Sequence, residues 1–411
     1  MKILQILDKK SEAGGGLVTH VGQLSRALEQ HGHSVDTLRL LDGADNSSAA
    51  GNHDEYILPY SYGQISGMRM DATLQELLER IHPQIIHIHG CFTTLSPVLF
   101  RRLNRHAPVV GTLHDIRPFC YLMSRRFGPG GELCHRTCGA GCFTSGCVRP
   151  RSPVDMVRLL RRWYVDHLRL EQWRHMDRVI VPSAYMQDLA LQHGFTEKQL
   201  RRVPHGTIMP AGQPSHRDQE SVPLILFIGT LIDYKGADLL VDALAQLKNH
   251  SWDAVLIGDG PDRSSVANAV SQYGLEHRVQ FHGQVADRKI INDFLTRATL
   301  LVLPSTIPES FALVGIEALA CGTPVVSFGL GGVREWLTDD VTGLIAKDGD
   351  STDLARQITK LLDNPDLARE MGIHGQTIVA ENFNFSDSAS QTCTIYDELS
   401  VQSQYSSQSA K

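Results

Sequence analysis

Two glutamates, Glu309 and Glu317, are separated by seven residues, and the second lies in an apolar helix predicted over residues 312–321. Glu317 is the only charged residue of that helix. A buried carboxylate needs a donor or a ligand, because an unpaired buried charge is costly. The first amides of the helix, Ala312, Leu313 and Val314, are free donors that attract phosphate. The segment therefore predicts an anion site between two carboxylates, and the alternative is a loop glutamate beside a salt-bridged helix glutamate.

A second pair of ionisable residues, His114 and Asp115, follows the β-rich run 109–113. This position is the carboxyl edge of a predicted parallel sheet, where open sheets bind ligands. We expect His114 to bond a substrate hydroxyl or stabilise developing charge, with Asp115 orienting it. His87 and His89 belong to a neighbouring predicted strand, and we expect one of them to face the core.

Glycine-rich turns follow several predicted strands. Gly14, Gly15 and Gly16 stand between a strand over 3–7 and a helix over 17–30, and they let backbone approach an anion closely. They do not form the dinucleotide fingerprint, since its third glycine would fall at Thr19. Each turn is either purely structural or part of a site. Similar turns in the second half are Gly229 to Gly236, which includes Lys235, and Gly258-Asp259-Gly260-Pro261.

The Asp348-Gly349-Asp350 sequence has the spacing of a metal-binding Asp-x-Asp motif. We interpret it as a turn and a cap for a helix over 353–362, because Asp before a helix is first of all a capping residue. Nothing else nearby in the sequence completes a metal shell.

Four cysteines, Cys134, Cys138, Cys142 and Cys147, are clustered in a glycine-rich insertion at about 120–153. In a cytoplasmic protein such clustering favours a metal over disulfides. The spacing nevertheless differs from paired Cys-x2-Cys zinc knuckles. Both a structural zinc site and free or redox-labile thiols therefore remain open, and the metal content is not predicted.

The bulk composition is that of a globular protein with more than one domain. The chain has 411 residues, 42% hydrophobic and 20% charged, and this length exceeds a single hydrophobic core. No apolar run approaches the length needed to cross a bilayer. The N-terminus leads directly into a strand without a signal-peptide pattern, so we expect a cytoplasmic protein.

Charge divides unevenly between the halves. Residues 1–205 carry 25 Lys and Arg against 19 Asp and Glu, whereas residues 206–411 carry 14 against 26. Most of the basic excess lies between Arg101 and Arg178, a stretch that includes a predicted helix over 154–177. In this helix Val154, Val157, Leu160, Tyr164 and Leu168 recur at helical spacing. This helix either rests on an anionic membrane surface or packs its apolar face in the core with a solvated basic face. No nucleic-acid signature accompanies it.

Alternation of β-rich runs with helical patterns predicts an α/β fold with parallel sheets. We expect a first domain over 1–205, a Pro- and Gly-rich linker over 206–222, and a second domain over 223–380. Residues 381–400 form a C-terminal segment that we expect to return to the first domain. The Ser- and Gln-rich residues 401–411 are predicted to be a disordered tail.

These motifs together resemble glycosyltransferase family 4 over nearly the whole chain. The second half is the more specific, with Gly229-x5-Lys235-Gly236, Gly258-Asp259-Gly260-Pro261, Pro304-Ser-x3-Glu309-x7-Glu317-Ala318 and Gly322-Thr-Pro-Val-Val326 in the family's order and spacing. The resemblance implies the GT-B fold, with two doubly wound Rossmann-like domains facing across a cleft. It also implies a retaining hexosyltransferase that uses a nucleoside-diphosphate sugar.

The same resemblance assigns roles to residues. Glu309, Lys235 and His114 would be catalytic: Glu309 would hold donor-sugar hydroxyls, Lys235 the diphosphate and His114 an outer sugar hydroxyl. Glu317 would bind the ribose of the nucleotide. The remaining donor-binding residues would be Gly15, Gly16, Gly229, Thr230, Gly258, Asp259, Gly260, Ser310, Phe311, Ala312, Leu313 and Val314.

One position departs from the family pattern. Thr230 stands where the family usually has arginine, and threonine cannot replace a guanidinium in a diphosphate clamp. Either Lys235 and the helix amides are sufficient to bind the diphosphate, or the diphosphate is bound more weakly, or another basic residue replaces the arginine.

Transfer would need no cofactor beyond the UDP- or GDP-sugar, because Lys235 and the helix dipole stabilise the leaving diphosphate. The acceptor is predicted to be a glycan or a lipid-linked oligosaccharide in polysaccharide biosynthesis, with the enzyme peripheral at the inner face of the membrane. The alternatives are an epimerase or phosphorylase with the same fold, or a sugar-binding homologue without turnover.

Overall fold

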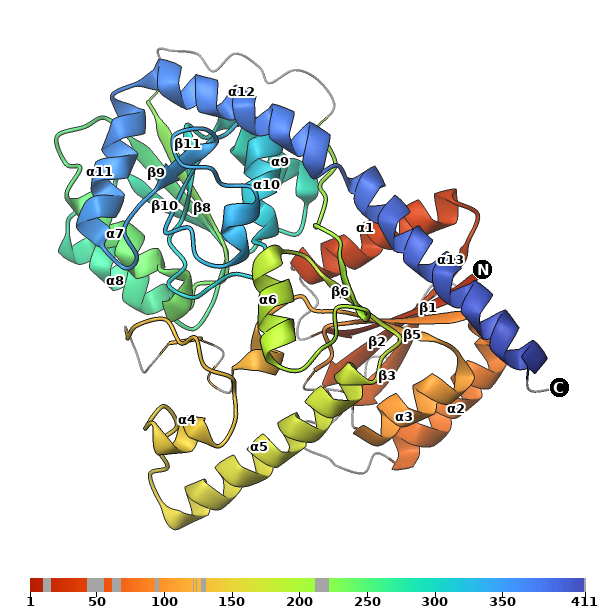
Figure 1. The fold of residues 1–411 in the computed structure, drawn as a ribbon. Coiled ribbons are helices and arrows are strands. Elements are labelled where there is room, and N and C mark those ends of the chain that lie inside the picture. The colour runs from red at the N-terminus through yellow and green to blue at the C-terminus, as the bar shows by residue number, and fades with distance from the viewer. Residues whose placement is uncertain are drawn as a thin grey trace. The chain divides into compact units, whose positions relative to one another are not determined.

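The computed structural model describes residues 1–9, 16–42, 55–60, 68–92, 95, 97–120, 122, 124–126, 131–210 and 222–409. The chain forms two compact units. Unit 1 comprises Met1–Met123, His135–Pro204 and Ser388–Lys411, and unit 2 comprises Ser124–Cys134 and His205–Asp387. Both units are parallel sheets flanked by helices (Figure 1), which is the doubly wound α/β arrangement of the GT-B fold.

Unit 1 contains a seven-stranded sheet in the order β3-β2-β1-β4-β5-β6-β7. Its strands are β1 Lys2–Lys9, β2 Ser34–Asp42, β3 Glu55–Tyr60, β4 Ile85–His89, β5 Val109–Thr112, β6 Arg178–Val181 and β7 Leu200–Arg202. Every pairing is parallel. The order changes direction between β1 and β4, and ligands bind such sheets beside this switch point.

The helices of unit 1 are α1 Gly16–Gln30, α2 Met68–Ile81, α3 Pro97–His106, α4 Gly141–Thr144, α5 Pro153–Arg174 and α6 Ala184–Gln192, with a 3-10 turn η1 Arg117–Phe119. The final helix, α13 Phe385–Ser409, belongs to unit 1 from Ser388 onward. The prediction of a disordered tail from residue 401 is wrong, because α13 continues to Ser409 despite its polar composition.

Unit 2 contains a six-stranded parallel sheet in the order β10-β9-β8-β11-β12-β13. Its strands are β8 Leu224–Ile228, β9 Asp253–Ile257, β10 Val279–Gly283, β11 Leu300–Leu303, β12 Val325–Ser327 and β13 Gly343–Ile345. Its helices are α7 Ala237–Ala245, α8 Arg263–Gln272, α9 Arg288–Arg297, α10 Leu313–Ala320, α11 Ser351–Leu362 and α12 Pro365–Asn382, with 3-10 turns η2 Asp233–Lys235 and η3 Gly332–Glu335. The switch point lies between β8 and β11, so the loops after these two strands flank it.

Side-chain alternation along β8 builds a core on each face of the second sheet. Ile225 and Phe227 pack with residues of α7, α8 and α11, whereas Leu226 packs with residues of α9, α10 and α12. Successive strand residues point to opposite faces, and helices cover both of them (Figure 1). A strand buried on both faces explains the continuous apolar runs in the sequence.

Candidate functional site

The loop after β11 brings Glu309 to the lysine of the loop after β8. Lys235 Nζ donates to Glu309 Oε1 at 2.5 Å, and the Ser305 hydroxyl donates to the same oxygen at 2.6 Å. Both loops flank the switch point of the second sheet, and they are also joined by a bond from the Thr306 amide to the Tyr234 carbonyl at 2.9 Å. Two predicted catalytic residues that are 74 positions apart therefore meet in one cluster.

Glu309 is held in its charged form. Burial raises the pKa of its carboxyl, but the Lys235 charge and the hydrogen bonds from Lys235 and Ser305 outweigh burial and leave the pKa below its ordinary value. The side chain retains 15% exposure, so a ligand can reach it. The cluster thus presents one carboxylate and one ammonium group in a fixed relation.

Glu317 also has a cationic partner, which the sequence did not indicate. Arg288, the first residue of α9, approaches its carboxylate with an Nη2–Oε1 distance of 2.6 Å. The carboxylate retains 12% exposure. The sequence left open whether Glu317 is a ligand-binding or a salt-bridged residue, and the structure gives it a salt bridge with an accessible edge.

The start of α10 leaves backbone donors available. No described acceptor takes a hydrogen bond from the amides of Phe311, Ala312, Leu313 or Val314. Ala312 caps the helix with a left-handed φ of 60°, a conformation that costs free energy in a non-glycine residue and is concentrated at functional sites. The side chain of Phe311 is buried, and its carbonyl accepts from Trp336 Nε1 at 2.6 Å. The predicted anion cradle therefore has its donors in place.

Two glycine turns at the ends of β8 and β9 pack backbone against backbone. A Cβ at Gly258 would lie 1.9 Å from the Gly229 carbonyl oxygen, and one at Gly260 would lie 2.2 Å from the Leu231 carbonyl oxygen. The Leu231 amide also bonds the Asp259 carbonyl at 3.0 Å. These glycines are required for close approach of the two loops, while the side chains of Thr230 and Asp259 remain exposed.

Arg126 contacts the loop that carries Glu309, and the sequence did not indicate this contact. Its guanidinium binds both oxygens of Asp348, at 2.6 and 2.7 Å, and donates to the Thr306 carbonyl. The segment Ser124–Cys134 is thereby attached to the loop that carries Glu309, within unit 2. The signal in the sequence was only the Arg125-Arg126 pair in the cysteine-rich insertion.

The capping interpretation of Asp348-Gly349-Asp350 is confirmed. Asp350 caps α11 and accepts from the amides of Thr352 and Asp353, both at 3.0 Å. Gly349 has a φ of +68°, the left-handed turn conformation that glycine adopts without strain.

In unit 1, His114 lies two residues past β5 and contacts a neighbouring histidine. His114 Nε2 is 3.1 Å from Nδ1 of His89, the last residue of β4. The expectation that Asp115 orients His114 is wrong, because Asp115 accepts its bonds from the amide and the guanidinium of Arg117 at 2.8 and 2.7 Å. Of the described contacts, the one with His89 is therefore in place to orient His114.

The expectation that only one of His87 and His89 faces the core is also wrong. Strand residues two apart lie on one face, both side chains are buried, and their ring centroids are 3.8 Å apart. His87 contacts the hydroxyl of Tyr396 on α13 at 2.5 Å and that of Thr112 on β5 at 2.7 Å. This buried polar link connects the last helix of the chain to the centre of the first sheet.

Burial keeps two of these histidines neutral. It lowers the pKa of His20, on α1, from 6.5 to about 4. Burial together with the neighbouring His20 lowers the pKa of His87 to about 3. Burial also raises the pKa of Tyr396 well above its ordinary value, so the Tyr396 hydroxyl keeps its proton.

Of the predicted glycine loop, Gly14 and Gly15 lie outside the described residues, and Gly16 is the exposed first residue of α1. The four cysteines of the insertion are half-buried, with Cys138 Sγ 4.0 Å from Cys142 Sγ. Within the described part of the chain, the group of three ligating side chains with metal-like spacing is His20, His89 and His114, and no cysteine belongs to it.

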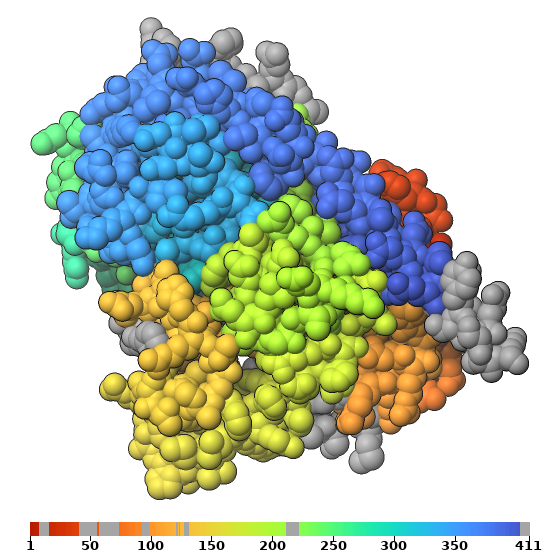
Figure 2. Space-filling model, viewed as in Figure 1, coloured from red at the N-terminus to blue at the C-terminus, as the bar shows by residue number. Residues whose placement is uncertain are grey.

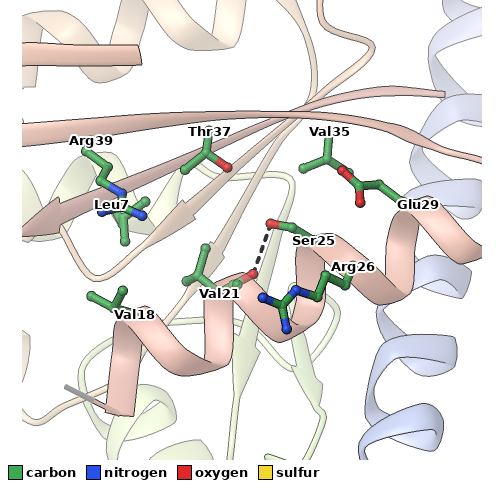
Figure 3. Close-up of a pocket in the computed structure, with 10 residues that line it drawn as sticks. Leu7, Val18, Val21, Ser25, Arg26, Glu29, Val35, Thr37 and Arg39 are labelled. Carbon is green, nitrogen blue, oxygen red and sulfur yellow. Dashed lines mark hydrogen bonds between the residues drawn. The ribbon is translucent and has the colours of Figure 1, made fainter. Parts of the chain in front are cut away.

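A pocket of about 350 Å³ opens between α1 and β2 in unit 1. Figure 3 shows Ser25, Arg26 and Glu29 of α1 beside Val35 and Thr37 of β2. The predicted site residues do not line this pocket. It lies along α1, and its lining residue Leu7 pairs with His89 in the sheet.

Four of the five residues of the apolar stripe of α5 are exposed and Leu168 is half-buried, contrary to the alternative in which the stripe packs in the core. Val154 is 62% exposed, Val157 65%, Leu160 44% and Tyr164 57%. The helix instead buries Leu170 and Trp173 near its C-terminus. Its side chains, yellow to yellow-green, form part of the surface in Figure 2. Among the described residues, Arg158 and Arg161 beside the stripe are exposed and form no ion pair.

Across the described ranges, none of the helices combines the length and apolar character that a membrane-spanning segment requires.

Comparison with known proteins gives matches to both halves. Residues 14–208 match the family described as Glycosyltransferase Family 4, and residues 211–377 match that described as Glycosyl transferases group 1. A D-inositol 3-phosphate glycosyltransferase of Arthrobacter sp. strain FB24 is 32% identical, with 93% of this chain and 90% of that protein covered. The solved structure of Anabaena HepE in complex with UDP-glucose superposes with a TM-score of 0.70 at 20% identity, covering 97% of this chain and 100% of that one.

Other curated relatives are matched over less of their length. An uncharacterised glycosyltransferase of Methanocaldococcus jannaschii is 30% identical over 43% of this chain, and the match spans 48% of that protein. The chain thus spans about half the length of several curated relatives that it matches.

Proposed function

We propose that this chain, which belongs to glycosyltransferase family 4, transfers a hexose from a nucleoside-diphosphate sugar to a glycan or lipid-linked acceptor with retention of anomeric configuration. The observation that carries the proposal is the cluster of Lys235, Glu309 and Ser305. Ser305 and Glu309 lie on the loop that leads into the unbonded amides of α10. Ammonium and backbone amides bind phosphate oxygens, and a carboxylate accepts from sugar hydroxyls.

Each part of the donor binds to residues of matching chemistry. Lys235 and the amides of residues 311–314 bind the diphosphate, Glu309 accepts from hydroxyls of the donor sugar, and Glu317 accepts from the ribose. Gly229, Gly258 and Gly260 let the two turns lie close enough to border the nucleoside. Thr230 supplies a hydroxyl instead of a guanidinium, so Lys235 and α10 carry the diphosphate charge between them.

Bond breaking proceeds by departure of the diphosphate from the anomeric carbon. Negative charge develops on the leaving oxygen, and the Lys235 ammonium and the α10 dipole stabilise it without moving far. The acceptor hydroxyl attacks from the face that the diphosphate leaves, and the departing phosphate oxygen receives its proton. His114 bonds an outer hydroxyl of the donor sugar, with His89 holding its ring.

The acceptor and its location follow from α5. The exposed stripe of Val154, Val157, Leu160 and Tyr164 is flanked by Arg158 and Arg161, the combination that binds the interface of an anionic bilayer. We assign this helix to docking on the inner face of the cell membrane. A lipid-linked acceptor in polysaccharide biosynthesis is then presented to unit 1.

The decisive experiment is a donor panel. The purified protein is incubated with UDP- and GDP-hexoses plus acceptor candidates, and free nucleoside diphosphate and the anomeric configuration of the product are measured. Release of UDP or GDP with a retained linkage supports the proposal. Binding without release, seen only as a shift in melting temperature, contradicts it and leaves a sugar-binding homologue.

A further inference from the structure

Three imidazoles converge at the carboxyl edge of the first sheet. His89 ends β4, His114 follows β5, and His20 lies in α1, which follows β1. These three strands are neighbours in the sheet, so their carboxyl ends open onto the same edge. One ring nitrogen from each histidine lies within 4.8 Å of the other two, and the ring centroids of His20 and His114 are 5.4 Å apart.

The spacing is close to that of a metal site. Tetrahedral Zn²⁺ with bonds of about 2.0–2.1 Å holds its ligand nitrogens about 3.4 Å apart. His89 Nδ1 and His114 Nε2 already lie at 3.1 Å. His20 has to move by only a fraction of its side-chain length to complete the triangle.

The chemistry of the group selects the kind of metal. Among the residues that the structure describes, it contains three imidazoles and neither a carboxylate nor a thiol. Imidazole suits Zn²⁺, Ni²⁺ and Cu²⁺, whereas Mg²⁺, Ca²⁺ and Mn²⁺ prefer oxygen ligands. His20 and His89 are buried while His114 is half-exposed, so a cation would reach the group from the side of His114.

The neighbouring His87 holds the ring of His89 in place. The ring of His87 packs against His89 at 3.8 Å, and both nitrogens of His87 are occupied by Tyr396 and Thr112. His87 is therefore a fixed support for His89, and supporting residues of this kind orient metal ligands.

We propose that His20, His89 and His114 form a binding site for a late first-row divalent cation such as Zn²⁺, and that an occupied site withdraws His114 from sugar transfer. Metal binding follows from the geometry of unit 1 alone. The inhibition rests on the proposed function, because it takes His114 to be a donor-binding residue. The free enzyme then works without the metal, and zinc acts as a reversible inhibitor.

Cobalt spectroscopy tests the site directly. The full-length protein, stripped with EDTA, is titrated with Co²⁺ in the visible and near-ultraviolet. We expect one equivalent to give d–d bands without thiolate-to-cobalt charge transfer, and Zn²⁺ to displace it. A charge-transfer band would place the metal on the cysteines and overturn the proposal, as would the lack of any d–d band.

Two ligand variants and one control sharpen this titration. His20→Ala and the half-exposed His114→Gln each remove one ligand, so Co²⁺ affinity falls by about 100-fold or more, at least the loss typical of supporting residues. His31→Ala, at an exposed histidine just after α1, retains full affinity. Unchanged affinity in either ligand variant contradicts the site, and His114→Gln decides the matter if His20→Ala does not fold.

Activity gives an independent readout once a donor is found. Zn²⁺ inhibits the wild type, and EDTA restores turnover, whereas His20→Ala keeps its turnover and loses the inhibition. Zinc inhibition that persists in His20→Ala overturns the inhibitory role. If no donor supports turnover, the proposed function fails, while the cobalt titration still decides whether the metal site exists.

Discussion

The site glutamates of unit 2 form ion pairs, whereas unit 1 has uncharged histidines buried at the edge of its sheet. Lys235 pairs with Glu309 and Arg288 with Glu317 at 2.5 and 2.6 Å. In unit 1, burial keeps His20 and His87 uncharged at neutral pH. A charged donor suits the first environment because it can exchange partners with existing pairs without burying an uncompensated charge.

Ligand binding therefore has a different electrostatic cost in each unit. In unit 2 an incoming diphosphate competes with Glu309 for Lys235, and the unbonded amides of α10 compensate for part of the lost pairing. In unit 1 the neutral His87 contacts the hydroxyls of Tyr396 and Thr112, so these buried contacts involve no charge. Charge removal should therefore damage function in unit 2, and charge addition should damage stability in unit 1.

The largest expected effect is on transfer in unit 2. Lys235→Ala removes the cation that stabilises the leaving diphosphate, and we expect kcat to fall by about 10²- to 10³-fold, as for loss of one preorganised donor. Steady-state kinetics with the accepted donor measures this. Lys248→Ala, at an exposed lysine of the same unit, serves as the control. Near-normal turnover in Lys235→Ala would remove Lys235 from the catalytic residues.

The next effect is on the stability of unit 1 at acidic pH. Unfolded His20 protonates near its ordinary pKa of 6.5, whereas folded His20 stays neutral down to about 4. The unfolded state therefore binds more protons between these values, and stability falls as the pH is lowered through this window. From pH 7 to pH 5 the loss is about 2 kcal/mol for this histidine alone.

Hydrogen exchange in EDTA-containing buffer at several pH values resolves the two units. We expect peptides of β1, β4 and β5 to lose protection as the pH falls from 7 to 5, more than peptides of β8 and β11. In His20→Gln the slope for unit 1 becomes shallower. Equal acid sensitivity in both units would contradict the electrostatic contrast between them.

A smaller effect is expected at Arg288. Arg288→Ala leaves Glu317 without its cationic partner and free to turn away from the ribose, so we expect donor KM to rise by about tenfold. Because the ribose does not react, kcat changes less. Lys289→Ala, the adjacent exposed cation on α9, should leave both parameters unaltered. A fall in kcat with constant KM would place Arg288 at the diphosphate instead.

The smallest effect is expected at the membrane. Arg158→Glu combined with Arg161→Glu replaces two unpaired cations beside the α5 stripe, and each basic residue near an anionic surface contributes about 1 kcal/mol. Sedimentation with phosphatidylglycerol vesicles should show weaker binding than for wild type, while neutral phosphatidylcholine vesicles should show little difference. Arg369→Glu, at an exposed position in unit 2, is the charge control. Binding that is independent of these arginines argues against α5 as the docking helix.

Local signals in the sequence predicted much of the fold. The apolar runs over 3–7 and 109–113 located β1 and β5 to within about one or two residues, because a strand buried on both faces reads continuously. Asp350 was predicted as a cap from its position before a helix. Strands with weaker patterns, β2, β3, β7 and β13, were not predicted, because short or mixed runs carry little periodicity.

The partners of the site residues were harder to predict. Asp115 follows His114 in the chain and was expected to orient it, but a closer donor, Arg117, takes its carboxylate. Arg126 reaches Asp348, which is 222 residues away in the chain. The α5 stripe was seen in the sequence, but an amphipathic pattern does not say which of its faces is covered.

The sequence by itself determined the parallel α/β architecture, the loops that carry Lys235 and Glu309, and the helix start that offers amides to an anion. These features depend on interactions within a few residues, namely periodicity, capping and turn conformation. The tertiary structure alone decided that Arg288 pairs with Glu317, that His20, His89 and His114 converge, and that Tyr396 reaches His87. Such pairings arise only when neighbouring strands and distant helices pack, because a charge or a ring nitrogen has many partners of equal chemistry along the chain and the fold selects one.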